Sequence, residues 1–172
     1  METLGSPPTM VVVMGVSASG KSTVGRLLAQ RLGWPFVEGD DLHPAENVAK
    51  MTAGHALDDT DREPWLHALT GLLRAATRAH SSTVVTCSAL RHAYRDALRA
   101  AAPGVWFLYL ALDQEIARER ISNRAEHFMP TQLLDSQYET LEPLRAGEPG
   151  LTVDAAARTD EVLALAQAAL DG

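Results

Sequence analysis

The sequence contains one cysteine, Cys87, and it lacks any long apolar run. A single cysteine cannot form an internal disulfide, so the composition gives no sign of an oxidising compartment. The longest apolar runs, residues 10–14 and 105–112, are far shorter than the ~20 residues of a membrane-spanning helix. No basic residue precedes the first run, so the start of the chain lacks the pattern of a signal peptide. We therefore expect a cytoplasmic protein without a membrane partner.

Positive charge is also scarce. The chain has 15 Lys and Arg residues against 22 Asp and Glu residues, which gives a net charge of −7. A general nucleic-acid binder needs a basic face to displace counterions from phosphates, so this balance argues against that class. It does not argue against a phosphate-handling enzyme, because such an enzyme needs only a few cations at its site.

The length of 172 residues fits one domain. We expect residues 1–9, which contain Gly5, Pro7 and Pro8, to form a flexible leader, and residues 10–172 to form the domain. Short apolar runs predict buried strands, and apolar residues at helical spacing predict helices. The predicted strands are 10–14, 35–37, 83–87, 105–110 and 151–153. The predicted helices are 21–32, 43–53, 61–79, 90–101, 113–124, 131–141 and 159–170.

Strands that alternate with helices indicate an α/β fold, here a three-layer sandwich in which helices cover both faces of a parallel sheet. Ligands of such folds bind at the carboxyl ends of the strands. We therefore expect the chemistry in the loops that follow Met14, Val37, Cys87 and Leu110.

The first of these loops carries a phosphate-binding motif. Residues 15–23 match the pattern G-x-x-x-x-G-K-[ST] between a predicted strand and a predicted helix. Backbone N–H groups and the helix N-terminus would hold phosphate oxygens, Lys21 would reach the β- and γ-phosphates, and the Ser22 hydroxyl would bind Mg²⁺. The pattern predicts a nucleoside triphosphate site formed by Gly15, Val16, Ser17, Ala18, Ser19, Gly20, Lys21, Ser22 and Thr23.

Two acidic residues follow the second predicted strand. Glu38 and Asp40 stand at its carboxyl end, facing the phosphate loop. In phosphoryl transfer to an alcohol, an acid there can orient the hydroxyl and take its proton, and we predict Asp40 for this role. Glu38 or Asp40 can also help to hold Mg²⁺ through water. The competing interpretation is that Asp40 or Asp41 only caps the helix that begins near His43.

Several further blocks resemble the gluconokinase family, which transfers phosphate from ATP to D-gluconate. The blocks are G-V-S-A-S-G-K-S-T, G-D-D-L-H-P, N-V-A-K-M, L-D-D-T-D-R-E-P-W-L, C-S-A-L-R, Y-R-D and a late stretch with H-F and E-T-L-E-P. The resemblance runs from about Val11 to Pro143. It implies a P-loop fold of the nucleoside-monophosphate-kinase or shikimate-kinase type and the cofactors ATP and Mg²⁺. It also implies phosphorylation of the 6-hydroxyl of D-gluconate, and a homodimer.

The same resemblance assigns a substrate-binding helical segment at about 41–80 and a lid at about 120–140. A substrate carboxylate needs a cation, and the blocks on the substrate side offer four. The sequence does not decide which of them binds the carboxylate: Lys50, Arg62, Arg91 or Arg95. Further candidates for substrate contact are His43, His127 and Gln137, with Gln137 also open to a role in a lid hinge or in packing. One departure is Ala18, where the family usually has glycine, because alanine disfavours a positive φ.

Two arginines, Arg120 and Arg124, lie four residues apart and share a helix face that leads into the lid. Arginines that arrive when a lid closes neutralise charge on the transferred phosphoryl group. We predict that both bind ATP and that Arg124 is catalytic, the alternative being ordinary surface charges. The resemblance thus implies a gluconokinase. The alternatives are another small-molecule kinase of the shikimate type and a nucleotide-dependent regulatory protein.

Overall fold

The computed structural model describes residues 7–88, 90–123 and 131–171. Within these ranges the strands are β1 (Met10–Met14), β2 (Phe36–Glu38), β3 (Thr83–Thr86), β4 (Val105–Ala111) and β5 (Gly150–Asp154). The helices are α1 (Lys21–Leu32), α2 (Ala45–Thr52), α3 (Asp59–Arg78), α4 (His92–Ala101), α5 (Gln114–Ser122), α6 (Thr131–Thr140) and α7 (Thr159–Asp171). A short 3₁₀ helix, η1 (Gly39–Leu42), follows β2. Every strand and helix predicted from the sequence is present, with ends shifted by a few residues.

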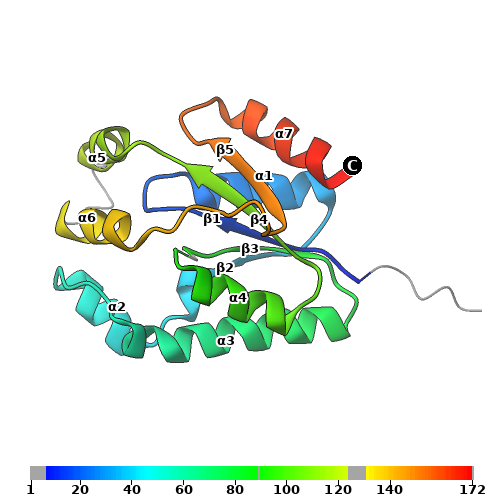
Figure 1. Ribbon diagram of the computed structural model, residues 1–172, viewed down its shortest axis with the longest axis horizontal. Helices are drawn as coiled ribbons and strands as arrows, with labels where there is room; N and C mark the ends of the chain where they lie inside the picture. The colour runs from blue at the N-terminus through cyan, green and yellow to red at the C-terminus, as the bar shows by residue number, and fades with distance from the viewer. Residues whose placement is uncertain (1–6, 89, 124–130, 172) are drawn as a thin grey trace, which may run out of the picture.

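The strands form one parallel sheet in the order β2-β3-β1-β4-β5. Figure 1 shows α1 and α7 on one face of this sheet and α3 and α4 on the other. Strand β1 lies in the middle and is buried along its whole length, which explains its uninterrupted apolar sequence. The predicted α/β three-layer sandwich is confirmed.

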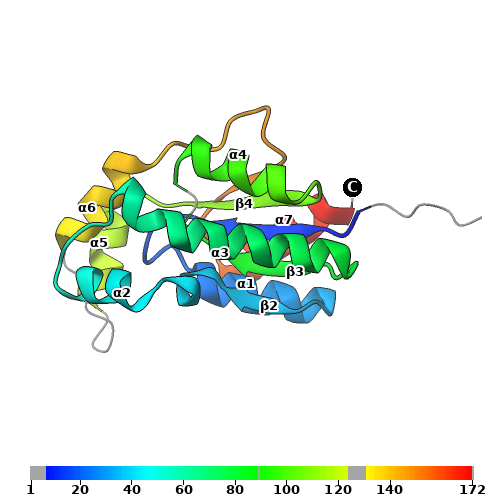
Figure 2. The ribbon, with the colours of Figure 1, turned by 90° about the horizontal axis from the view of Figure 1, so that it is seen from below.

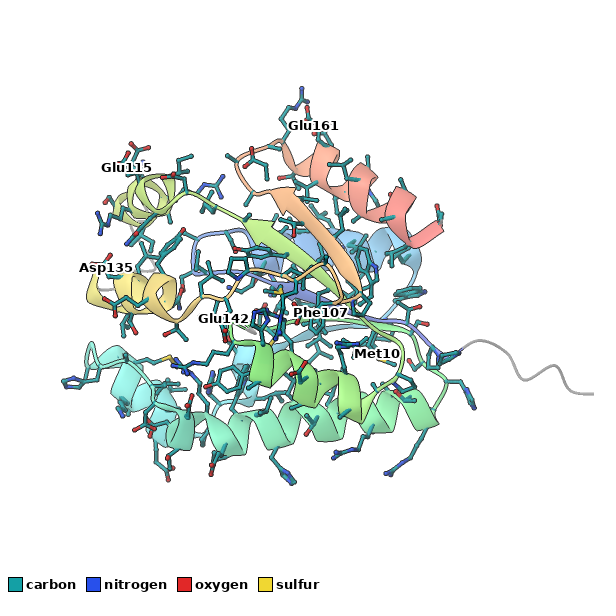
Figure 3. The ribbon with its side chains drawn as sticks, in the orientation of Figure 1. Met10, Phe107, Glu115, Asp135, Glu142 and Glu161 are labelled. Atoms are coloured by element: carbon teal, nitrogen blue, oxygen red, sulfur yellow. The ribbon has the colours of Figure 1, made fainter. Side chains whose placement is uncertain are left out.

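Alternating side chains of β1 enter two separate cores, one on each face of the sheet. Val11 and Val13 pack toward α1 and α7. Met10 packs on the opposite face with Phe107 of β4 and with Trp65 of α3. Figure 2 shows α3 and α4 lying over this second face, and Figure 3 shows Met10 and Phe107 on the same side of the sheet as α4.

Local polar contacts set two helix starts that apolar spacing misplaces. Helix α3 begins earlier than predicted because Asp58 caps it: its carboxylate accepts from the Asp61 backbone N–H, and the Asp61 carboxylate accepts from the Asp58 N–H. Helix α2 begins later than predicted, because Pro44 occupies its N-cap with an extended backbone. The four residues of η1 precede it and were not predicted.

Because the strands are parallel, their carboxyl ends share one edge of the sheet, and the loops that follow β1, β2 and β3 meet there. Helices α2, α5 and α6 lie at this end of the molecule, and the C-terminus lies at the other (Figures 1 and 2). No helix in the described ranges is long and apolar enough to cross a membrane.

Candidate active site

The phosphate loop joins β1 to α1 at the centre of this edge. Gly15 has a φ of +152°, and a Cβ on it would lie 2.9 Å from the carbonyl oxygen of Leu110, so the loop needs glycine there. Lys21 bends back over the loop, and its Nζ donates to the carbonyl oxygens of Gly15 at 2.9 Å and Val16 at 3.1 Å. The loop therefore combines a tightly bent backbone with a cation and a helix N-terminus, the elements of a phosphate site.

Ala18 adopts the left-handed conformation, with a φ of +70°, and it is buried. The left-handed backbone costs alanine about 1–2 kcal/mol. Replacement by glycine removes this cost, but it also removes a buried methyl group worth about 0.8 kcal/mol and makes the unfolded chain more flexible. We expect Ala18→Gly to leave the free energy of unfolding within about 0.5 kcal/mol of the unchanged protein in urea titrations.

The matched control is Ala166→Gly, at a buried alanine in the middle of α7. This right-handed position has no strain to relieve, so the variant should lose about 1.5–2 kcal/mol from helix propensity and the missing methyl group. Equal losses in the two variants would show that the left-handed backbone of Ala18 carries no cost.

Glu38, the last residue of β2, reaches the phosphate loop. Its Oε1 accepts from the Ser22 hydroxyl at 2.9 Å and from the Thr86 hydroxyl at 2.6 Å. The ends of β2 and β3 pack closely because the residue after Glu38 is glycine. A Cβ on Gly39 would lie 1.8 Å from the Thr86 carbonyl oxygen. The sequence pointed to Ser22 and Glu38 together, but gave no signal for Thr86, which is an ordinary strand residue in the sequence.

A pocket of about 370 Å³ opens beside the phosphate loop. Six residues predicted for the site line it together: Ser17, Lys21, Asp40, His43, Arg62 and, from α6, Gln137. The remaining lining residues are Val48, Met51, Thr52, Ala56, Leu57, Trp65, Ser88, Leu90, Leu133 and Ser136. A mostly apolar pocket with a few convergent polar groups is the usual form of a small-molecule site.

Asp40 lies in η1 and lines the pocket. The alternative role as a cap of α2 is wrong for both Asp40 and Asp41, because Pro44 occupies the N-cap of α2 and no side chain caps that helix. The Asp40 carboxylate therefore does not cap α2, and it lies where the hydroxyl of an acceptor in the pocket could contact it.

His43 lines the same pocket and stacks on the indole of Trp65, with ring centroids 4.9 Å apart and planes at 10°. Burial lowers the pKa of His43, the charge of Asp40 opposes this shift, and Arg62 adds to it. The imidazole is therefore neutral near pH 7. Trp65 itself belongs to the core and is only 1% exposed.

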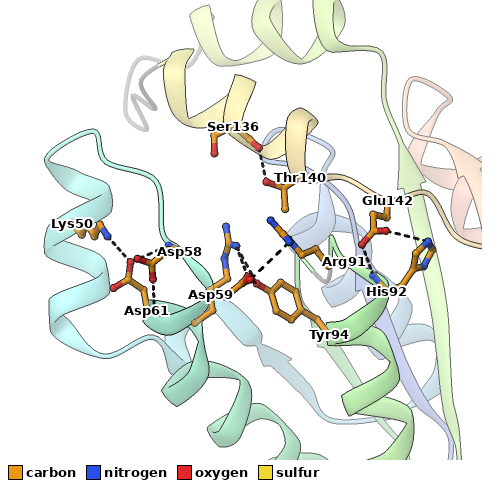
Figure 4. A network of polar contacts seen from close by, with 11 residues as sticks. Lys50, Asp58, Asp59, Asp61, Arg91, His92, Tyr94, Ser136, Thr140 and Glu142 are labelled. Atoms are coloured by element: carbon orange, nitrogen blue, oxygen red, sulfur yellow. Dashed lines mark hydrogen bonds and ion pairs between the residues drawn. The ribbon is translucent and has the colours of Figure 1, made fainter.

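Arg62 reaches the pocket from α3 and is held by a polar cluster on its outer side. Its guanidinium donates to the Tyr94 hydroxyl at 3.2 Å and lies 3.8 Å from the Asp59 carboxylate. Asp59 also accepts from Tyr94 and pairs with Arg91 at 3.8 Å. Figure 4 shows Arg91 and Tyr94 converging on Asp59. The hydrogen bond from Tyr94, with the two arginines, keeps the pKa of Asp59 below its ordinary value.

The structure does not place Lys50 or Arg91 in the lining of the pocket. Lys50 forms an ion pair with Asp61 at 2.5 Å, and this hydrogen bond raises the pKa of Lys50. Figure 4 shows the pair at the start of α3, where Asp61 belongs to the capping box. Lys50 thus joins α2 to α3, and Arg91 lies beside Asp59, so contact of either residue with a substrate stays a prediction.

The structure corrects the predicted role of Arg95. This arginine was predicted as a substrate ligand, but its side chain is 0% exposed and its Nε donates to Glu148 at 2.8 Å. A second contact from the guanidinium reaches the carbonyl oxygen of Pro143 at 3.2 Å. Burial opposes ionisation of Glu148, but hydrogen bonds from Arg95 and from the Arg145 backbone outweigh it and lower the pKa of Glu148. Arg95 therefore fixes the segment after α6 against α4.

We expect Arg95→Ala to lower the free energy of unfolding by about 3–5 kcal/mol, because Glu148 would remain buried without its partner. The control is Arg99→Ala, an exposed site on the same helix, for which a change of at most about 0.5 kcal/mol is expected. Urea unfolding followed by circular dichroism measures both. A loss in Arg95→Ala no larger than that of the control would contradict the structural role.

Gln137 and Arg120 hold the phosphate loop from the side of α5 and α6. The Gln137 side chain accepts from the Ser17 N–H at 2.7 Å and donates to the Ser17 hydroxyl at 3.1 Å. Arg120 donates to the carbonyl oxygens of Ala18 at 3.0 Å and Ala155 at 2.9 Å. The predicted site residues Arg124 and His127 lie outside the described residues.

A second pocket, of about 220 Å³, lies on the far side of the phosphate loop between α1 and α7. It is lined by Ser19, Gly20, Thr23, Val24, Leu110, Arg120, Ala155, Ala157, Thr159 and Val162. The Ser19 hydroxyl is buried there and has no hydrogen-bond partner among the described residues. Two pockets that flank one phosphate loop suit a reaction between a nucleotide and a second substrate.

Comparison with known proteins agrees with a reaction between a nucleotide and a second substrate. The AAA domain family matches residues 10–144. A gluconokinase from Gluconobacter oxydans is 44% identical over 160 residues, which cover 93% of this chain and 90% of that protein. The crystal structure of a gluconokinase from Sinorhizobium meliloti is similar with a TM-score of 0.87 at 45% identity, covering 97% of this chain and 94% of that one. Shikimate kinase from Aquifex aeolicus, with a TM-score of 0.66 at 16% identity over 95% and 97% of the two chains, shares the fold.

Proposed function

The chain belongs to the gluconokinase family of P-loop kinases, and from this premise we propose that it transfers the γ-phosphate of ATP to the 6-hydroxyl of D-gluconate. The products are 6-phospho-D-gluconate and ADP. The observation that carries the proposal is that Lys21 of the phosphate loop, Asp40 and Arg62 line one pocket. A phosphate-binding cation, a carboxylate and a second cation are what transfer to a hydroxylated carboxylate requires.

The nucleotide would lie across the phosphate loop. Backbone N–H groups of the loop and the N-terminus of α1 bind its phosphates, and the Lys21 ammonium stabilises charge on the transferred group. The pocket between α1 and α7 would take the nucleoside, with Arg120 beside it. Gln137 holds the Ser17 N–H at 2.7 Å, so this contact keeps the loop in shape on the acceptor side.

The acceptor would occupy the larger pocket. Asp40 accepts a hydrogen bond from the hydroxyl and takes its proton as the new bond to phosphorus forms. Arg62 lines this pocket as a second cation besides Lys21, and its planar guanidinium suits a carboxylate group. Arg91 lies next to it on the Asp59 cluster and would add to the positive potential there.

Ser22 and Glu38 fit a magnesium ion, because both offer oxygen atoms and they lie within hydrogen-bond distance of each other at 2.9 Å. The other candidate for this ion is Asp40, through a bridging water. When bound, Mg²⁺ would supply positive charge to the phosphate oxygens. The hydrogen bonds from the Ser22 and Thr86 hydroxyls hold that carboxylate beside the loop.

The domain plan extends the proposal. Residues 41–80, which include α2 and α3, would bind the acceptor, and residues 120–140 would act as the lid that brings Arg120, Arg124 and His127 to the substrates. The leader is proposed for residues 1–9, although Thr9 already donates its N–H to the Ser82 hydroxyl at 3.0 Å.

Family resemblance supports a cytoplasmic homodimer that acts on a small molecule rather than on nucleic acid or membrane. Light scattering after size exclusion tests the dimer.

The decisive experiment is ADP release from ATP and Mg²⁺ with and without D-gluconate. The control acceptors are shikimate and a nucleoside monophosphate, the substrates of the rival kinase classes. We expect release that depends on D-gluconate alone, with the phosphate on the terminal carbon of the product by ³¹P–¹H NMR coupling. Equal release without any acceptor would favour the regulatory alternative, and release with shikimate would favour the other kinase.

A further inference from the structure

The imidazole of His43 is fixed in its plane by the aromatic ring beneath it. The stacked Trp65 is itself immobile, because it is buried and its Nε1 donates to the Gly39 carbonyl oxygen at 2.9 Å. Stacking sets the plane of the imidazole but leaves open how the ring is turned within that plane. A second contact must decide which ring nitrogen faces the pocket.

Asn47 of α2 supplies this second contact. Its side chain is buried, and its Nδ2 lies 3.2 Å from His43 Nδ1 and 2.7 Å from the Asp61 carbonyl oxygen. A carbonyl oxygen can only accept, so the contact with Asp61 requires the amide nitrogen, and not the amide oxygen, at this place. The same nitrogen can only donate to His43.

The tautomer of His43 follows from this. Nδ1 must accept from Asn47, so the ring proton lies on Nε2. An imidazolium would carry a second N–H at Nδ1, directly opposed to the amide donor. Nε2 lies on the other side of the ring from Nδ1. In the described part of the chain no hydrogen-bond partner of Nε2 is present, although His43 lines the pocket with Asp40.

We propose that Asn47 is a positioning residue that holds His43 as a neutral Nε2–H donor, and that this donor binds the oxygen of the acceptor hydroxyl beside Asp40. A hydroxyl group can satisfy both partners at once, because it donates to the carboxylate and accepts from the imidazole. A protonated amine cannot accept, and a ketone cannot donate. The pair therefore favours a hydroxyl over an amine or a ketone as the acceptor, which deepens the proposed function and depends on it for the identity of the alcohol.

The tautomer is measured without substrate, by ¹⁵N NMR of the imidazole nitrogens. The His43 signals are identified by their loss in His43→Gln. In the unchanged protein we expect a protonated Nε2 and an unprotonated Nδ1, and in Asn47→Ala a mixture of both tautomers. A proton on Nδ1 in the unchanged protein, or the same tautomer in Asn47→Ala, would overturn the proposal. A loss of packing alone would not move these signals in this way.

The kinetic arm compares two replacements of His43. The amide nitrogen of glutamine can stand where Nε2 stood, whereas that of asparagine stands near Nδ1. We expect the KM for D-gluconate to rise about threefold in His43→Gln and at least about tenfold in His43→Asn and in Asn47→Ala, with the KM for ATP unchanged. Glu46→Gln, at an exposed position of α2, is the matched control and should change neither.

Equal impairment of His43→Gln and His43→Asn would overturn the role of Nε2–H. The two arms also separate this proposal from the proposed function. If D-gluconate is not phosphorylated, the proposed function fails, while the NMR comparison still decides whether Asn47 sets the tautomer. If D-gluconate is phosphorylated and Asn47→Ala changes neither tautomer nor KM, only the present inference fails.

Discussion

Lys21→Ala is expected to lower gluconate-dependent ADP release by about 10³-fold or more, the range found when a cation or donor aimed at transferred charge is removed. The Lys21 ammonium lies over the phosphate loop, 2.9 Å from the Gly15 carbonyl oxygen, where it can follow charge onto the γ-phosphate. The fold should persist, because Lys21 contacts loop carbonyls and belongs to neither core cluster.

The control for this variant is Arg31→Ala, which removes an exposed cation from the last turn of the same helix. It should leave turnover unchanged, since the polar contact of Arg31 in the described part of the chain is with the exposed side chain of Gln167, away from both pockets. Circular dichroism checks the fold of both variants. Full turnover in Lys21→Ala with a native spectrum would remove the phosphate loop from the mechanism.

Asp40→Asn should lower turnover by roughly 10²–10⁴, the usual range for loss of general acid–base help. The lower end is expected, because a loose phosphoryl transition state needs little proton transfer at an early stage. Asparagine keeps the size of the side chain, and Asp40 caps no helix, so the melting temperature should change little. Steady-state ADP release and thermal unfolding of the same preparation measure the two effects.

Asp41→Asn is the neighbouring control. Asp41 belongs to the same 3₁₀ turn but does not line the acceptor pocket, so its loss of charge should leave turnover nearly unchanged. Near-normal turnover in Asp40→Asn would refute its role as the base. Glu38, which lies within hydrogen-bond distance of Ser22, would then be the next carboxylate to replace.

The parts of the fold and site that could be predicted are those encoded by neighbouring residues. The phosphate loop is a contiguous motif, and β1 is a contiguous apolar run, so both were located from the sequence. The position of Asp40 followed from one rule, that ligands bind at the carboxyl ends of parallel strands. These inferences need no knowledge of how distant segments pack.

The wrong prediction for Arg95 and the open role of Gln137 concern contacts between distant segments. Arg95 looks like any other cation on a helix, and only the packing of Glu148 from 53 residues away turns it into a buried ion pair. The contact of Gln137 with Ser17 spans 120 residues, which is why its role stayed open. Nothing in the sequence indicated that Lys50 pairs with Asp61 at 2.5 Å, and its contact with a substrate stays a prediction.

Strand β1 lies at the centre of the sheet, and the two proposed binding pockets lie on either side of the phosphate loop that follows it. The pocket on the β2 and β3 side and the pocket on the β5 and α7 side have no lining residue in common within the described ranges, and different residues of the phosphate loop line each. Substitutions in one pocket should therefore combine almost additively with substitutions in the other. A directed-evolution programme could change the alcohol that is phosphorylated by altering α2 and α3 alone. Under the proposed function, the nucleotide preference would carry over intact.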